Sequence, residues 1–341
     1  MAADAVASEP GVSQEMSNQE QGRMQRVSIS VVITTYNRAA LLADALQSVA
    51  ASRIEDGGAV EVIVVDNNST DDTPGTVAKV QSDGFPFALR YVLESNQGLS
   101  YARNRGADES TGTYIAFMDD DQLLDEDYLS CLVPAFRSTG AVCVGGRILY
   151  YNIGELPRWL SPFLQRIGQC DYGENVKILG PADEKLLGGN MSYVRRELID
   201  IGKFDVSLGR KSGTLLAGEE FELQARLHAA GKRVAYHPSL VQYHYFSPAR
   251  KTKRYWRRHH FDHGRTLYRT RLLEVGQDAG QKVFGAPPWL WRSLITRDLP
   301  RAVWSFTSLD AAEIFDKQLD VWTNLGRIRE AREQSAMRKR Q

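Results

Sequence analysis

Four short apolar runs alternate with helix-like segments in the first part of the chain. The runs cover residues 27–35, 60–65, 89–93 and 114–118. Such runs, without regular polar alternation, are typical of strands buried on both faces of a parallel sheet. After the first run, Leu42, Leu46 and Val49 recur at helical spacing, and we expect the preceding Asn37 to cap that helix. The alternation predicts an α/β fold with a doubly wound, largely parallel sheet.

Carboxylates stand where two of these runs end. Asp66 follows the second run, and Asp119, Asp120 and Asp121 follow the fourth. Open α/β sheets bind ligands at the carboxyl ends of their strands. Three adjacent carboxylates repel one another unless water or cations neutralise them, and Mg²⁺ or Mn²⁺ carrying a substrate's phosphates would do so. The alternative for the triplet is a solvated acidic turn.

The composition narrows the class of protein. The 42 basic and 42 acidic residues cancel, so no overall field favours nucleic acid as a partner. Three cysteines without metal-like spacing indicate reduced thiols and a cytoplasmic protein. Residues 1–25 lack an apolar stretch and are expected to form a disordered tail. Thr34–Arg38 contains no glycine, which argues against dinucleotide and P-loop sites.

The later part of the chain has two further features. Glu219 and Glu220 stand at the start of a helix expected near 218–230; acids are also favoured there by the helix dipole alone. The segment Lys251–Arg271 is basic with interleaved aromatic residues. It could contact a donor diphosphate or an anionic lipid-linked acceptor, lie on a membrane surface as an amphipathic helix, or be an ordinary surface helix.

Ordered motifs extend over about residues 28–246. They cover residues 31–38, 62–71, 96–106, 117–121, 188–190, 202–205 and 218–223, followed by His244. In this order the motifs resemble family 2 glycosyltransferases of the GT-A fold. The resemblance implies a nucleotide-sugar-binding half at 26–125, an acceptor-binding and catalytic half at 126–250, and a C-terminal helical extension at 251–341.

The resemblance also implies roles for single residues. Thr35, Tyr36 and Asp66 would line the nucleobase pocket. Asp119 would face the donor ribose with Asp120 beside it, while Asp121, Asp119 and His244 would hold Mn²⁺ or Mg²⁺. For His244, a single histidine after a strand, a purely structural role is the alternative. Glu220 would be the general base, although an aspartate is commoner at its position, which leaves Glu219 open as the acting carboxylate. Separately, Arg103 is a bidentate donor suited to a donor phosphate, or else part of a solvated helix face.

The expected activity is metal-dependent transfer of one sugar per event from a nucleotide sugar, with UDP as the commonest nucleotide and with inversion. The acceptor would be a glycan or a lipid-linked hydroxyl, and the protein could touch the inner face of a membrane through its C-terminal region. The processive relatives carry a Q-x-x-R-W-type element, which Arg254–Arg258 does not match. The rivals are a non-catalytic nucleotide- or carbohydrate-binding protein and a sugar nucleotidyltransferase, which would need a glycine-rich loop after the first strand.

Overall fold

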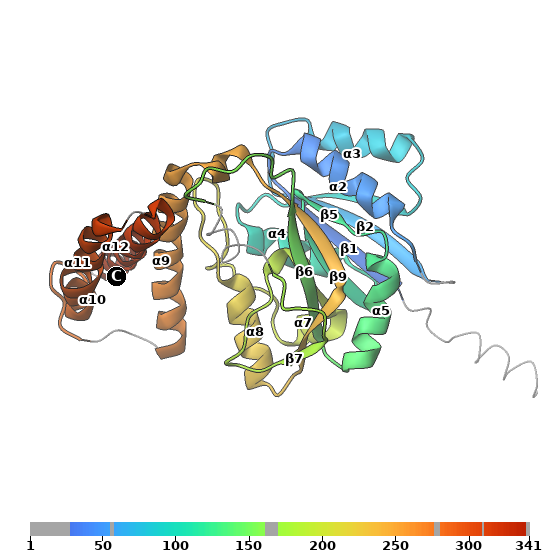
Figure 1. Ribbon diagram of the computed structural model, residues 1–341. Coiled ribbons are helices and arrows are strands. Elements are labelled where there is room, and N and C mark those ends of the chain that lie inside the picture. Colours follow the sequence, from blue (N-terminus) through green and yellow to red (C-terminus); the bar gives the residue numbers. More distant parts are fainter. Residues whose placement is uncertain (1–27, 55–57, 161–169, 276–279, 309, 339–341) are drawn as a thin grey trace, which may run out of the picture.

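The computed structural model describes residues 28–54, 58–160, 170–275, 280–308 and 310–338. The expected tail at 1–25 lies outside these residues. The described chain forms a mixed α/β domain around a nine-stranded sheet, followed by a helical extension (Figure 1).

The first half of the sheet is parallel and covered on both faces. Its strands are β1 (Ser28–Thr35), β2 (Ala59–Asp66), β3 (Ala88–Leu93) and β4 (Tyr114–Asp119). They lie in the order β3-β2-β1-β4. The helices that connect or follow them are α2 (Ala39–Ala51), α3 (Thr73–Ser82), α4 (Leu99–Glu109) and α5 (Tyr128–Thr139). The doubly wound arrangement is confirmed for this half.

The second half of the sheet is mixed. It contains β5 (Gln122–Leu124), β6 (Cys143–Tyr151), β7 (Lys177–Leu179), β8 (Met191–Val194) and β9 (Val234–Tyr245). The strand β8 pairs antiparallel with both β4 and β6, and β9 pairs parallel with β6 but antiparallel with β5 and β7. The helices α7 (Arg195–Asp200) and α8 (Glu219–Ala229) belong to this half.

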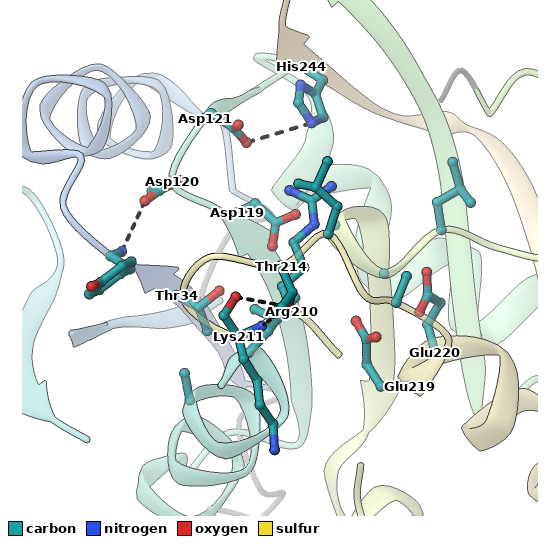
Figure 2. Close-up of a pocket in the computed structure, with 18 of the residues that line it drawn as sticks. Thr34, Asp119, Asp120, Asp121, Arg210, Lys211, Thr214, Glu219, Glu220 and His244 are labelled. Atoms are coloured by element: carbon teal, nitrogen blue, oxygen red, sulfur yellow. Dashed lines mark hydrogen bonds and ion pairs between the residues drawn. The ribbon is translucent and has the colours of Figure 1, made fainter. Parts of the chain in front are cut away.

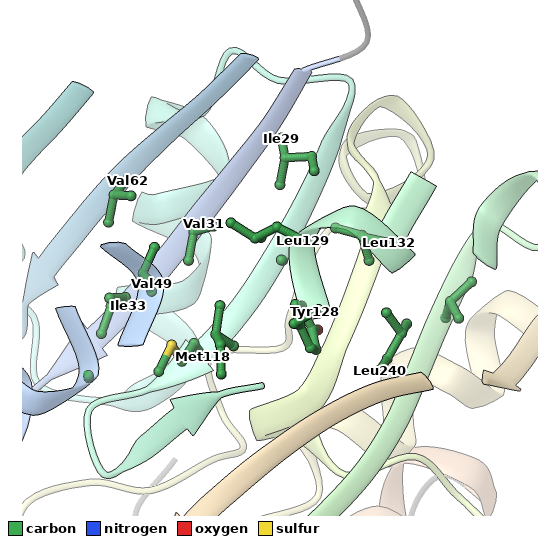
Figure 3. Packing of buried hydrophobic residues seen from close by; sticks show 14 of the residues in the cluster. Ile29, Val31, Ile33, Val49, Val62, Met118, Tyr128, Leu129, Leu132 and Leu240 are labelled. Atoms are coloured by element: carbon green, nitrogen blue, oxygen red, sulfur yellow. The ribbon is translucent and has the colours of Figure 1, made fainter. Parts of the chain in front are cut away.

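Alternate residues of the central strands supply two separate cores. Val31 of β1 packs in one cluster with residues of α2 and α5, including Val49 and Leu129 (Figure 3). Val32 points to the opposite face and packs in a second cluster with residues of α4 and α8, including Ala102. Because successive strand residues face opposite sides, a continuous apolar run satisfies both layers. The sheet is thereby fixed between helices, and its carboxyl edge is held in place.

The capping role expected for Asn37 is wrong. Asn37 adopts a left-handed conformation with φ 53°, and its Oδ1 accepts a hydrogen bond from the Thr70 N–H at 2.7 Å. The first N–H of α2, at Ala39, donates to Asp71 Oδ2 at 3.0 Å instead. An acid from the neighbouring loop thus satisfies the helix start, in keeping with the helix dipole.

The extension contains two long helices and a shorter helical segment. These are α9 (Lys253–Val275), α12 (Ala311–Arg338), α10 (Pro288–Ser293), η3 (Leu294–Asp298), α11 (Leu299–Trp304) and η4 (Ser305–Thr307). Helices α9 and α12 pack against each other, and a Cβ added at Gly264 would lie 1.8 Å from a backbone carbonyl oxygen of α12. Trp256 and Tyr268 of α9 are buried, so these aromatic residues face protein and not a membrane. Within the described residues, none of the helices has the length and apolar character needed to cross a bilayer.

Candidate functional site

A cavity of about 790 Å³ opens at the carboxyl edge of β1 and β4. Its lining comes from the β1–α2 loop, the end of β4, the 210–217 loop, the first turn of α8 and one side of α9. Figure 2 shows the carboxylates of Asp119, Asp120 and Asp121 and those of Glu219 and Glu220 reaching it from different elements. Every residue expected at the site lines this cavity except Asp66.

Asp120 organises the loop after β1. Its Oδ2 accepts hydrogen bonds from Thr35 Oγ1 at 2.9 Å and from the Tyr36 N–H at 3.3 Å. The guanidinium of Arg38 bridges Asp120 and Asp121, with its Nη1 at 3.0 Å and 2.6 Å from their carboxylate oxygens. Burial raises the pKa of Asp120 to about 7, with the charge of Asp121 adding to the rise and Arg38 opposing it. Asp120 therefore holds the loop, and its expected place beside the donor stays a prediction.

Asp121 lies beside an imidazole. Its Oδ1 is 3.7 Å from His244 Nε2, and His244 Nδ1 is 3.0 Å from the Tyr245 carbonyl oxygen. With Nδ1 donating to that carbonyl, the Nε2 lone pair accepts from Arg250 Nη2 at 3.3 Å beside the Asp121 carboxylate, and the ring has the tautomer found in many metal-binding histidines. Burial lowers the pKa of His244, and the nearby Arg250 lowers it further. The imidazole is thus neutral at pH 7, the form that binds metals.

Carboxylate oxygens and an imidazole nitrogen are ligand types that Mn²⁺ accepts, and Mg²⁺ favours carboxylates together with waters and substrate phosphates. Among the residues that the structure describes, however, no three histidine, cysteine or acidic side chains are grouped so that they could hold a metal ion. The expected metal-binding role of Asp119, Asp121 and His244 therefore stays a prediction.

Arg103 connects the two groups of carboxylates. It is 2% exposed, and its Nη1 donates to Glu219 Oε1 at 2.8 Å while its Nη2 donates to Asp119 Oδ1 at 3.1 Å. Gly188 lies against it, and a Cβ there would come within 2.7 Å of Nη1. Arg103 is therefore not on a solvated helix face; its expected contact with a donor phosphate stays a prediction. The buried pairing fixes the position of Asp119 relative to the start of α8.

Glu220 is a buried acid at the first turn of α8. Its Oε2 accepts a hydrogen bond from the Gly218 N–H at 3.2 Å. Burial is the main cause that raises its pKa to about 8, and the neighbouring charge of Glu219 contributes, against the opposing effect of Arg103. A carboxyl group with such a pKa can exchange a proton near neutral pH, as a general base must.

Asp66 occupies the expected sheet edge but does not line the cavity. Its Oδ1 accepts from the Ser69 N–H and its Oδ2 from the Tyr91 hydroxyl, both at 2.8 Å. Asn67, the next residue, lines the cavity instead. The expected contact of Asp66 with a nucleobase stays a prediction, since both oxygens are bonded within the protein.

Sequence reasoning missed several residues that line the cavity. Arg210 and Lys211 come from the loop before α8, and His259 and His263 come from α9. The two histidine rings are stacked 6.5 Å apart. Their spacing of four residues places them on one helix face. Contact with a donor diphosphate was one alternative for the segment Lys251–Arg271, but neither histidine was expected at the site.

Comparisons with known proteins identify the family of this chain. The model of the family described as "Glycosyl transferase family 2" matches residues 30–200. The succinoglycan biosynthesis protein ExoM of Rhizobium meliloti is 30% identical over 216 residues, 63% of this chain and 65% of that protein. The glucosyl-dolichyl phosphate glucuronosyltransferase of Haloferax volcanii is 28% identical over 62% of this chain and 66% of its own length. The matched part thus spans just under two thirds of these relatives.

Solved structures show the same fold. The mannosyltransferase PcManGT from Pyrobaculum calidifontis, solved with GDP-Man and Mn²⁺, superposes with a TM-score of 0.58 at 20% identity, covering 93% of this chain and 89% of that one. Residues 1–349 of S. aureus TarS, solved with UDP, give a TM-score of 0.51 at 16% identity, covering 92% of each chain. The fold is therefore GT-A. With its residues 30–200 matching the family model, the chain belongs to glycosyl transferase family 2.

Proposed function

We propose that this protein is a metal-dependent glycosyltransferase that moves one sugar per event, with inversion, from a nucleotide sugar to a hydroxyl acceptor. The observation that carries the proposal is the single cavity lined by Asp119 and Asp121 from the end of β4 and by Glu219 and Glu220 from the start of α8. A nucleotide sugar needs the first group and an attacking hydroxyl needs the second.

Residues at the end of β4 would bind the sugar donor. Asp119 and Asp121, with His244, would hold Mn²⁺ or Mg²⁺ together with the donor diphosphate. When bound, the cation would offset the negative charge that develops on the departing nucleoside diphosphate. The titles of two solved neighbours support this assignment: PcManGT was solved with GDP-Man and Mn²⁺, and TarS with UDP. UDP is our first choice of nucleotide.

Glu220 would act on the acceptor hydroxyl. The acceptor oxygen forms its bond to the anomeric carbon as the bond from that carbon to the diphosphate oxygen breaks, and the hydroxyl proton passes to Glu220. Glu219 accepts from Arg103 at 2.8 Å, so we assign Glu219 to positioning and Glu220 to proton transfer. A lipid-linked acceptor is supported by the name of a Campylobacter jejuni relative, 34% identical over 39% of this chain, which is an undecaprenol-linked glycan glucosyltransferase.

A panel of nucleotide sugars, scored for release of nucleoside diphosphate with Mn²⁺ present, tests the proposal. Asp121→Ala and Glu220→Gln should each lower the release rate at least a hundredfold, the usual scale for losing charge stabilisation or a general base. Glu222→Gln is the matched control, because Glu222 is in the same helical turn and pairs with Arg226 at 2.6 Å. If the panel gives no release while UDP still binds, the protein is a non-catalytic binder. If nucleotide is released but both variants keep full activity, the site is wrongly assigned.

A further inference from the structure

The helical segment 288–307 exposes a row of large apolar side chains. Ile295, Leu299, Val303, Trp304 and Phe306 are between 43% and 77% exposed. The first three recur every four residues and so share one face of the segment. Single exposed apolar residues are ordinary, but a gathered group on one face marks a surface that binds something. We call these five residues the apolar ridge.

The opposite side of the same segment is firmly packed. Leu290 and Leu294 are buried in a cluster with residues of α9 and α12. Asp298 is 1% exposed and accepts a hydrogen bond from Asn324 Nδ2 of α12 at 2.7 Å. Figure 1 shows α11 on the side of α12 that faces away from α9 and from the sheet. The apolar ridge therefore has a fixed orientation, outward from the body of the protein.

Every exposed charge within the segment 288–307 is an arginine, although the nearby Asp320 of α12 is an exposed acid. Arg292, Arg297 and Arg301 are all exposed, while the one acid in 288–307, Asp298, is buried. Asp298 pairs with Arg297 at 2.7 Å, and the charge of Asp320 on α12 also contributes to raising the pKa of Arg297. Arg292 and Arg301 are left to face solvent. Exposed Trp, Phe and aliphatic side chains bordered by arginines are the combination that binds the interface of an anionic bilayer.

We propose that the apolar ridge docks on an anionic lipid surface, with its side chains entering the headgroup boundary and Arg292 and Arg301 meeting the lipid phosphates. A second copy of the chain is a poorer occupant. A two-fold pairing of this segment would bring Arg292 and Arg301 of one copy toward the same arginines of the other, while the segment itself offers no exposed carboxylate to balance them. The proposal does not depend on the sugar-transfer activity.

Vesicle flotation of the full chain tests the proposal, with phosphatidylcholine vesicles compared to vesicles that also contain phosphatidylglycerol. The wild type should float with the anionic vesicles and much less with the neutral ones. Trp304→Ser with Phe306→Ser should abolish flotation. Arg292→Gln with Arg301→Gln should weaken it about fivefold for each arginine removed, and added salt should weaken the wild type similarly.

Val176→Ser with Ile178→Ser is the matched control, because these residues at β7 are also exposed (46% and 52%) but lie on the sheet domain. This variant should float like the wild type, and equal melting temperatures should show that all variants are folded. The proposal is overturned if the wild type does not float, or if the control loses as much binding as the ridge variant. It is also overturned if sedimentation shows a dimer that Trp304→Ser with Phe306→Ser dissolves, since the occupant is then a second copy.

Discussion

Replacing Glu220 by glutamine should stabilise the folded protein at alkaline pH while it removes the proposed base. Burial, with the charge of Glu219, raises the pKa of Glu220 from 4.5 to about 8. Relative to the unfolded chain, the folded protein therefore favours the protonated carboxyl by roughly three thousandfold, which is on the order of 5 kcal/mol at about 1.36 kcal/mol for each factor of ten. The ionised carboxylate that a general base requires is therefore the form of Glu220 that destabilises the folded protein.

The direction of the pH effect on stability follows from the pH at which Glu220 ionises in the folded and in the unfolded protein. The unfolded chain loses the Glu220 proton near pH 4.5, whereas the folded protein keeps it until about pH 8. Between these values the unfolded state binds fewer protons, so the wild type loses stability as the pH rises. Glutamine carries no charge at any pH and escapes this loss. The stability gain of Glu220→Gln should be small near pH 4.5 and should approach the order of 5 kcal/mol by about pH 8.

Urea unfolding followed by tryptophan fluorescence at several pH values between 5 and 9 measures this gain. Glu222→Gln serves as the control, because its carboxylate is paired with Arg226 near the surface, and it should show no gain that grows with pH. The reasoning is refuted if the difference between Glu220→Gln and the wild type is the same at pH 5 and pH 9, or if the variant is the less stable protein at pH 9.

Three further changes follow from the same contacts. Glu219→Gln removes a charge that raises the pKa of Glu220, so the rise of the nucleotide-release rate with pH should move to lower pH; an unmoved profile contradicts this. Gly189→Ala would put a Cβ 2.5 Å from Gln122 Nε2 and 2.9 Å from Asp119 Oδ2, and Gln122 Oε1 accepts from the Asp119 N–H. Calorimetry should therefore find weaker binding of UDP with Mn²⁺, and an equal Kd would count against Asp119 as a ligand. Gly264→Ala should destabilise the packing of α9 on α12 by about 1–3 kcal/mol, whereas an unchanged urea midpoint would show that the helices separate freely.

The local sequence pattern was enough to predict which carboxylates lie at the carboxyl edge of the sheet. Strands such as 114–118 are marked by their apolar residues, and a strand that ends in Asp119 must present that carboxylate at the carboxyl edge. The ordered motifs also brought Glu219 and Glu220 to the same cavity although a hundred residues separate them from β4. These predictions depended on short-range periodicity and on family resemblance.

Features set by long-range packing could not be predicted. Arg103 looked like a solvated or phosphate-binding residue because its two partners, Asp119 and Glu219, are distant in sequence. The Asp71 side chain replaced Asn37 at the start of α2 for the same reason. The sequence shows that α9 is basic with interleaved aromatic residues, but not which of its faces meets solvent, lipid or another helix.

In the proposed reaction, Asp119 and Asp121 bind the donor and Glu220 acts on the acceptor. Calorimetric titration of UDP with Mn²⁺ into two variants tests this separation of roles most directly. Glu220→Gln should bind UDP with wild-type affinity, because Glu220 acts on the acceptor. Asp121→Ala should lose most of the Mn²⁺-dependent affinity, because Asp121 would hold the cation that carries the diphosphate. Equal losses in both variants, or full affinity in Asp121→Ala, would contradict the account.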